Sequence, residues 1–195
     1  MEQHYLDDLI GKGESLLMVK VYKSQNEFDE IKFNKFCKKY DFMFPKELVN
    51  YLKEYNDSRL EDNIIKDSEY GVYIRNFYGT SREDYLDIST NYDCYIGRLP
   101  YKCVPIADPE FGNQICISLS GDSYGKIYFW DHEIMDTEDG EKCTLSVEDM
   151  VLLANSFDEL LEKIVEFTFD MEEKNIKHIK ITERIKKLFK IYNKS

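Results

Sequence analysis

The side chains best placed in the sequence for catalysis or metal binding are those of Trp130-Asp131-His132-Glu133, where a histidine lies between two carboxylates. A histidine beside a carboxylate can act as a general base or bind a metal ion. If the strand predicted before this run continues through it, adjacent side chains point to opposite faces, so His132 cannot share one face with both neighbours. The run therefore favours a structural role or a partner contact over catalysis, and it predicts no metal site.

Other catalytic signatures do not occur in the chain. A P-loop, a Gly-x-Gly-x-x-Gly dinucleotide site and a Gly-x-Ser-x-Gly elbow are all missing from the sequence. Gly112-Asn113 is interpreted as a turn that permits positive φ rather than as a phosphate loop. The five cysteines form no Cys-x-x-Cys pair, which predicts reduced, mostly buried thiols and no zinc site. We predict a protein that is not an enzyme and has no cofactor.

Charge and hydropathy narrow the class of protein. The 195 residues include 26 Lys and Arg and 38 Asp and Glu, a formal charge of −12. Nucleic-acid binding depends on a basic surface, so this balance argues against a nucleic-acid partner. The first residues lack the cationic start and apolar core of a signal peptide, and no apolar run is long enough to span a bilayer. We therefore expect a cytoplasmic protein without a membrane span.

The spacing of apolar residues predicts the helices and strands that must position these residues. Ser24-Gln25-Asn26-Glu27 has the spacing of a capping box and predicts a helix that follows it, with Phe28, Ile31, Cys37 and Tyr40 as its apolar residues. A second helix is predicted to begin near Pro45 and to bury Leu48, Tyr51, Leu52 and Tyr55. Alternation over residues 69–76 favours a strand.

The second half of the chain has the stronger β pattern. Residues 103–107, 114–119 and 126–130 are rich in Val, Ile, Tyr and Phe and are separated by turn residues, which predicts an antiparallel meander. Residues 151–154 are a candidate last strand. Ser156-Phe157-Asp158-Glu159 is another capping box, and the helix that it opens is predicted to place Leu160, Leu161, Ile164, Phe167 and Met171 on one face.

Three segments of this pattern, taken together, resemble a known family. They are Pro45-Lys46-Glu47-Leu48 through Tyr55-Asn56, Val104-Pro105-Ile106-Ala107-Asp108 through Trp130-Asp131-His132-Glu133, and Ala154-Asn155-Ser156-Phe157. Their order and spacing are similar to the SUKH superfamily, which takes in the fungal cell-wall assembly regulator and many bacterial immunity proteins. The matching positions, which we expect to be mainly structural, are Pro45, Tyr55, Asn56, Pro105, Gly112, Asn113, Gly125, Tyr128, Trp130, Asp131, His132, Glu133, Ser156 and Phe157.

The resemblance implies an α+β fold, with an antiparallel or mixed β-sheet flanked by helices. It also implies a binding role, since bacterial members typically bind and neutralise a cognate polymorphic toxin, often a nuclease. The alternative is a scaffold or regulatory module with a partner that is not a toxin. A weaker third possibility is an enzyme built around Asp131, His132 and Glu133.

An acidic surface suits an inhibitor of a nuclease, because such a toxin must carry cationic groups where it holds phosphates. The candidate contacts with a cognate toxin are Asp136, Glu138, Asp139, Glu141, Glu83 and Asp84, together with Glu61, Asp62, Asp67 and Glu69. For each of these residues alone, a solvated surface position is the favoured interpretation.

The last residues differ in charge from the rest. Residues 171–195 carry eight Lys and Arg against three acids, and Ile181, Ile185, Leu188, Phe189 and Tyr192 follow helical spacing. This predicts an added C-terminal amphipathic helix that docks on the acidic body, forms a homodimer or meets an anionic membrane or polymer. The predicted organisation is an N-terminal extension over 1–23, a SUKH-like domain over 24–170 and this basic tail over 171–195.

Overall fold

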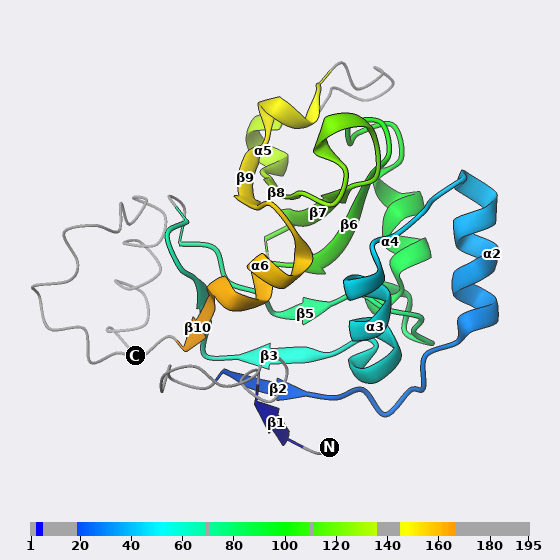
Figure 1. Ribbon diagram of the computed structural model, residues 1–195, viewed down its shortest axis with the longest axis vertical. Helices are drawn as coiled ribbons and strands as arrows, with labels where there is room; N and C mark the ends of the chain where they lie inside the picture. The colour runs from blue at the N-terminus through cyan, green and yellow to red at the C-terminus, as the bar shows by residue number, and fades with distance from the viewer. Residues whose placement is uncertain (1–2, 6–18, 69–70, 110, 136–144, 167–195) are drawn as a thin grey trace, which may run out of the picture.

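The computed structural model describes residues 3–5, 19–68, 71–109, 111–135 and 145–166, and it has the predicted α+β architecture (Figure 1). The helices are α2 (Glu30–Tyr40), α3 (Lys46–Tyr55), α4 (Ile88–Tyr95), α5 (His132–Met135) and α6 (Phe157–Lys163), with 3-10 turns η1 (Asp84–Leu86), η2 (Gly121–Ser123) and η3 (Val147–Asp149). The strands are β1 (Gln3–Tyr5), β2 (Lys20–Tyr22), β3 (Arg59–Glu61), β4 (Asn63–Ile65), β5 (Asn76–Phe77), β6 (Cys103–Asp108), β7 (Gln114–Ser118), β8 (Ile127–Trp130), β9 (Val151–Ala154) and β10 (Ile164–Glu166).

Eight of these strands form one sheet in the order β1-β2-β3-β5-β6-β7-β8-β9, and β10 pairs separately with β4. Every pairing between these strands is antiparallel. The predicted meander is confirmed as β6-β7-β8, and the predicted last strand is confirmed as β9. The sheet is therefore antiparallel rather than mixed in the part of the chain that the structure describes.

Alternate side chains of the meander belong to two different apolar clusters. Ile106, Ile115 and Phe129 belong to the main core, which includes the buried faces of α3 and α6. On the alternate positions, Cys116 and Trp130 belong to a smaller cluster that Leu99, Cys103, Tyr128, Val147 and Met150 complete. Because successive side chains of a strand point to opposite faces, one run of residues supplies both clusters.

Two of the predicted helices have the predicted buried faces or caps. Helix α3 begins directly after Pro45 and buries Leu48, Tyr51, Leu52 and Tyr55, as the spacing predicts. Helix α6 begins after Ser156, whose hydroxyl accepts a hydrogen bond from the Glu159 N–H at 3.1 Å. The rings of Tyr51 and Phe157 lie 5.2 Å apart, which joins α3 to α6 over the sheet.

The first helix was predicted with the wrong cap and with one wrong residue on its apolar face. Asp29, not Ser24, caps α2, since its carboxylate accepts from the Lys32 N–H at 2.9 Å. The Ser24 hydroxyl instead accepts from the Asn26 N–H and forms a local turn. The helix buries Phe33 and Phe36, whereas Ile31 is 70% exposed. Phe28, Cys37 and Tyr40 are partly buried and pack against the core, so the predicted face is right at these three positions and wrong at Ile31.

The predicted extension of α6 is also wrong. The helix ends at Lys163, and Ile164–Glu166 forms β10, which pairs with β4. Pairing with a strand that lies far away in the sequence outweighs the local helical spacing at Ile164. Phe167, Met171 and the whole predicted tail lie outside the described residues.

The strand predicted over residues 69–76 is reduced to β5, which contains only Asn76 and Phe77. The backbone of Ile74 is hydrogen-bonded to a side chain instead of to another strand. Its N–H donates to Asn63 Oδ1 at 2.9 Å, and its carbonyl accepts from Asn63 Nδ2 at 2.7 Å. One side-chain amide thus takes the place of a neighbouring strand.

Helix α4 was not predicted, since its polar sequence Ile88–Tyr95 has no apolar stripe. The Asp87 carboxylate caps this helix by accepting a hydrogen bond from the Thr90 N–H.

In Figure 1, α2 and α4 stand side by side at the right of the sheet, where the rings of Phe36 and Tyr92 are 5.8 Å apart. Cys103 and Cys116 are buried free thiols, and Cys37 and Cys94 are also free. Cys143 lies outside the described residues. None of the helices in the described ranges is long and apolar enough to cross a membrane.

Candidate partner-binding surface

His132 does not lie on a strand, so the premise that residues 131–133 continue β8 is wrong. Strand β8 ends at Trp130 and α5 begins at His132. The side-chain oxygen of Asn113 lies 2.9 Å from His132 Nδ1 and accepts from the His132 N–H at 3.2 Å. His132 thus binds the β6–β7 hairpin to the end of β8, which is a structural contact between two parts of the sheet.

Gly112 is required at this contact for two reasons. Its φ is +82°, a conformation that side chains other than glycine rarely adopt. A Cβ atom at this position would also lie 3.3 Å from His132 Cε1. The positive φ therefore favours glycine here, and a side chain at this position would make a tight contact with the imidazole ring.

Beside His132, a second group of side chains closes the smaller apolar cluster. Trp130 is fully buried and packs edge-on against Tyr95, with ring centroids 5.4 Å apart. The Arg98 guanidinium lies 5.2 Å from the Tyr95 ring centroid and 5.5 Å from that of Trp130. The Tyr95 hydroxyl accepts from Gln114 Nε2, and Gln114 Oε1 accepts from the Tyr78 hydroxyl. Burial raises the pKa of Tyr78 and of Tyr95, so both phenols stay neutral and act as packing groups.

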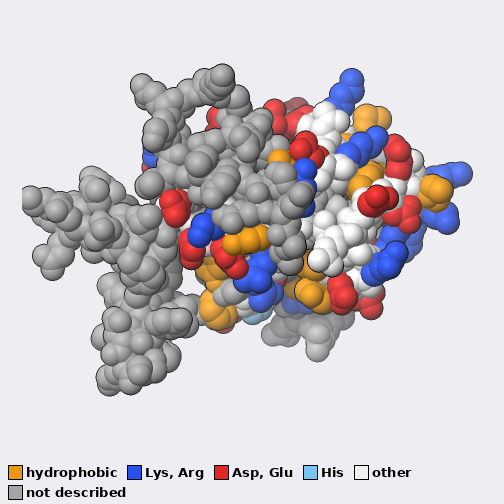
Figure 2. All heavy atoms as spheres, turned by 90° about the horizontal axis from the view of Figure 1, so that it is seen from below, with side chains coloured by type: hydrophobic (Ala, Val, Ile, Leu, Met, Phe, Trp, Pro, Cys, Tyr) orange, Lys and Arg blue, Asp and Glu red, His pale blue; other side chains and the backbone are white. Residues whose placement is uncertain are grey.

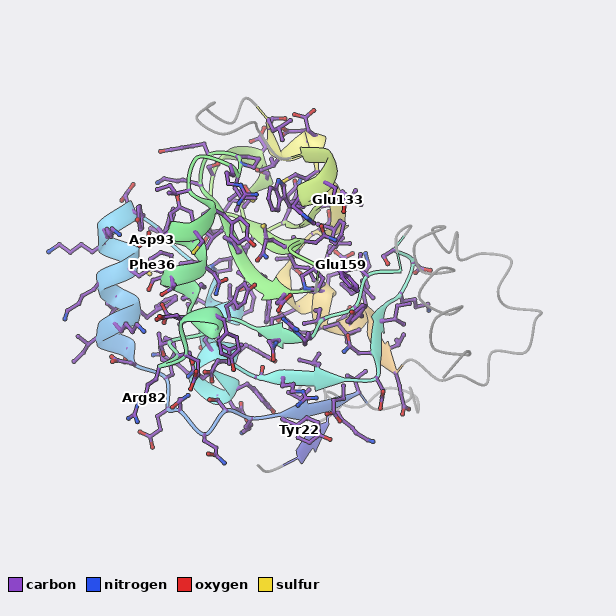
Figure 3. All side chains as sticks on the ribbon, turned by 180° about the vertical axis from the view of Figure 1, so that it is seen from behind. Tyr22, Phe36, Arg82, Asp93, Glu133 and Glu159 are labelled. Atoms are coloured by element: carbon purple, nitrogen blue, oxygen red, sulfur yellow. The ribbon has the colours of Figure 1, made fainter. Side chains whose placement is uncertain are left out.

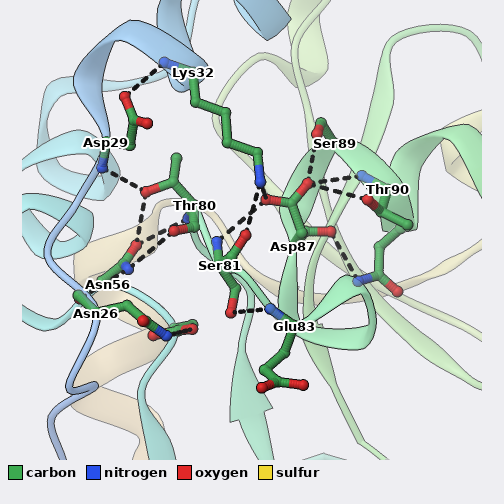
Figure 4. A network of polar contacts seen from close by, with 12 residues as sticks. Asn26, Asp29, Lys32, Asn56, Thr80, Ser81, Glu83, Asp87, Ser89 and Thr90 are labelled. Atoms are coloured by element: carbon green, nitrogen blue, oxygen red, sulfur yellow. Dashed lines mark hydrogen bonds and ion pairs between the residues drawn. The ribbon is translucent and has the colours of Figure 1, made fainter.

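Asn56, which directly follows α3, is the centre of a buried polar network (Figure 4). Its side-chain oxygen accepts from the Thr80 N–H at 2.9 Å, and its amide nitrogen donates to the carbonyls of Asn26 and Thr80. A Cβ on Gly79 would lie 2.3 Å from Asn56 Oδ1 and 2.7 Å from the backbone of residue 56. The network therefore depends on the close approach of two backbone segments.

The same network contains an ion pair, between the half-exposed Lys32 and the buried Asp87, that fixes the loop before α4. Lys32 Nζ lies 2.6 Å from Asp87 Oδ2, and it also donates to the Ser81 carbonyl at 2.7 Å. Burial opposes ionisation of Asp87, but hydrogen bonds from Lys32, Ser89 and the Thr90 N–H hold the pKa of its carboxyl below the usual value. Asp87 is therefore a charged anchor between α2 and α4.

In the loop that precedes Asp87, the predicted contact residues Glu83 and Asp84 are exposed to solvent. They lie next to Tyr85, which is 64% exposed. Asp136, Glu138, Asp139 and Glu141 lie outside the described residues. The acids that flank them are Asp131 and Glu133 on one side and Glu148 and Asp149 on the other. Figure 3 labels Arg82, the neighbour of Glu83 in the chain, and Glu133 far apart on the molecule.

Charge is distributed unevenly along the chain. Between Asp108 and Glu166 there are fifteen Asp and Glu against three Lys, a net of −12, which equals the formal charge of the whole chain. On the face seen in Figure 2, acidic and basic side chains are interspersed instead. The excess of negative charge therefore belongs to the part of the sequence from the end of β6 to β10.

Sequence reasoning missed a polar pocket of about 450 Å³ between the segment before α2 and the carboxyl end of α3. Its wall is formed by Ser24, Gln25, Asn26, Glu27, Phe28, Glu30, Lys53, Glu54, Tyr55 and Asn56. Two of its segments stand out in the sequence for other reasons, residues 24–27 as a capping box and Tyr55-Asn56 as a family motif. No group of three or more His, Cys, Asp or Glu side chains suited to a metal ion occurs in the described ranges.

Residues 27–163 match the model of the SMI1 / KNR4 family (SUKH-1). The chain belongs to the SUKH-1 family. It is also 28% identical over 160 residues to the SPbeta prophage-derived uncharacterized protein YokK of Bacillus subtilis (strain 168), an alignment that covers 71% of this chain and 77% of the relative.

The SUKH-1 motif positions lie at junctions of the fold. Tyr55, Pro105, Tyr128 and Phe157 are buried, and Ser156 caps α6. Gly125 has a φ of +82°, and a Cβ there would lie 3.7 Å from Pro45 Cγ. Asn56, Gly112, Asn113, Trp130 and His132, placed above, also lie where elements of the fold meet.

Proposed function

We propose that this protein is a bacterial immunity protein that binds and neutralises a cognate polymorphic toxin. Membership of the SUKH-1 family over residues 27–163 carries the proposal, since the family takes in many such proteins. Neutralisation is stoichiometric, by occlusion of the toxin, and involves no catalysis by this chain. The toxin is a cationic enzyme, and a nuclease is the best-suited class.

The charge distribution supports this partner chemistry. A net charge of −12 between residues 108 and 166 would attract a surface that holds phosphates and would speed association. Glu83 and Asp84 offer a second acidic contact beside exposed Tyr85, and tyrosine is common at the centres of interfaces. The predicted contacts Asp136, Glu138, Asp139 and Glu141 belong to this proposal.

The remaining parts of the proposal concern setting and assembly. We place the protein in the cytoplasm, where it would meet a toxin that has entered or has just been made. Residues 171–195 are proposed to form a basic amphipathic helix that supports a homodimer. A scaffold or regulatory module with a different protein partner is the alternative, which the family also includes.

The test is co-expression with the toxin domain encoded directly beside this gene. The expected result is co-purification in a fixed ratio, loss of toxin activity and an association rate that falls as salt rises. A neighbouring toxin domain that stays fully active and does not co-purify would refute the proposal. Capture of a partner unrelated to any toxin would instead support the scaffold alternative.

A further inference from the structure

Three sulfur atoms meet in the smaller apolar cluster. The Cys103 thiol on β6 lies 4.0 Å from the Met150 sulfur, and both residues belong to the cluster together with Cys116 on β7. In the register of the two strands, Cys103 lies opposite Ser118, which is two residues along from Cys116. The two cysteines are therefore diagonal neighbours on one face of the sheet, within reach of each other.

The two thiols interact with each other away from water. Both are fully buried and free. Burial and the neighbouring Cys103 thiol raise the pKa of the Cys116 thiol, so this thiol keeps its proton at neutral pH. A single buried cysteine is usually a small packing group. Two thiols beside a thioether differ from it, because sulfur ligands of these two kinds are the ones that soft metal ions prefer.

The donor set selects the metal. No His, Asp or Glu of the described residues completes a larger group with the two cysteines. Closed zinc sites are tetrahedral, and two thiols with one thioether leave that shell incomplete. Copper(I) is a soft cation that thiolate and thioether ligands select, and it accepts a shell of few ligands. The three sulfurs therefore suit copper(I) better than zinc.

The indole of Trp130 is a separate observation in the same cluster. It is fully buried, and its Nε1 has no hydrogen-bond partner among the described residues. Trp130 lies opposite Gln114, two residues from Cys116, so it is a diagonal neighbour of this thiol. An indole N–H can only donate, and a thiolate is a stronger acceptor than a thiol. A metal that displaces the thiol proton therefore creates an acceptor beside an unused donor.

We propose that Cys103, Cys116 and Met150 bind one copper(I) ion. Both thiols release their protons to solvent and bind the ion as thiolates, the Met150 thioether is the third ligand, and the copper stays in the +1 state throughout. The complex has a net negative charge. The Trp130 N–H offsets this charge, as does the Arg98 guanidinium, which lies 5.5 Å from the centroid of the Trp130 ring.

The bound ion joins β6, β7 and the residue before β9, so its binding stabilises the fold. Met150 is the ligand nearest to solvent, at 6% exposed, and it directly follows the short turn η3. Its unbranched side chain changes conformation easily, whereas the cysteines are fixed in the sheet. The ion therefore enters as the η3 segment moves, and the site is independent of any toxin.

The test uses the full, reduced chain in the absence of oxygen and of added thiols. Copper(I) is supplied as its bicinchoninate complex, whose absorbance falls when the protein removes the ion. Uptake of one ion per chain is expected, with tighter binding as the pH rises, because protons are displaced. The melting temperature should also rise with copper(I). If the wild-type chain removes no copper(I), the proposal is overturned.

Variants separate this site from the other thiols. Cys116→Ala should abolish uptake and Met150→Leu should weaken it severalfold, whereas Cys94→Ala, which removes an exposed thiol on α4, should leave it unchanged. Uptake that survives in Cys116→Ala, or is lost in Cys94→Ala, overturns the site. X-ray absorption of the wild-type complex decides the matter even if a variant does not fold. A shell of sulfur alone is expected, and nitrogen or oxygen ligands on the copper contradict the assignment.

Discussion

Replacement of Asn56 tests how the fold of this protein is held at its most polar buried point. Asn56→Ala removes the acceptor of the Thr80 N–H and the donor to the Thr80 carbonyl, and Thr80 is only 5% exposed. Each buried polar group left without a partner costs about 1–3 kcal/mol, so the two groups together cost about 2–6 kcal/mol. Asn56 also has a φ of +48°, which costs alanine about 1 kcal/mol more than glycine.

The assay is equilibrium unfolding of the full chain in urea, with the free energy of unfolding compared among variants. Asn56→Ala should lose about 2–6 kcal/mol, and Asn56→Gly should be about 1 kcal/mol more stable than Asn56→Ala. The matched control is Asn50→Ala on the exposed face of α3, which should change stability by no more than about 0.5 kcal/mol. The reasoning is refuted if Asn56→Ala costs no more than the control, or if Asn56→Gly is the less stable of the two.

Three further predictions follow from other contacts. Gly79→Ala should cost about 3 kcal/mol in urea unfolding, because its Cβ would lie 2.7 Å from the backbone of residue 56, and a near-neutral effect would contradict this close approach. Lys32→Met leaves the Asp87 carboxylate buried without its cation and should lower the free energy of unfolding at neutral pH by about 2 kcal/mol, whereas an unchanged value would show that the pair contributes nothing. The pKa of Glu159 is lowered from 4.5 to about 2 by Lys163 and Asn155, so its contribution is present above pH 4.5 and is lost as the pH falls toward 2. Glu159→Gln should therefore flatten thermal stability against pH in that window, and an acid limb identical to wild type would contradict the assignment.

Local signals predicted the elements whose contacts are mostly within one segment. The spacing of Leu48, Tyr51, Leu52 and Tyr55 identifies the buried face of α3 because helical periodicity alone decides which side chains share a face. The alternation in residues 103–130 likewise predicts the meander, since short Gly-bearing turns bring consecutive strands together as antiparallel pairs.

The same reasoning failed where a distant segment competes for the backbone. Ile164 has helical spacing to the residues before it, yet it pairs with Ile65 across about a hundred residues of sequence. Ile74 looks like part of a strand, but the side chain of Asn63 takes both of its backbone groups. Sequence periodicity contains no information about such partners, because they are set by where the chain returns in space.

Composition and motif order, taken from the sequence alone, determined the α+β class, the acidic character and the SUKH-1 resemblance. Each depends on residue type and spacing, which folding does not change. Only the tertiary structure decided that His132 binds the Asn113 hairpin and that Asn56 joins α3 to the loop before α4. The pocket lined by Glu27 and Glu54 was also visible only there. Hydrogen-bond partners and pockets arise when segments distant in sequence meet, and the packing of the whole chain determines that meeting.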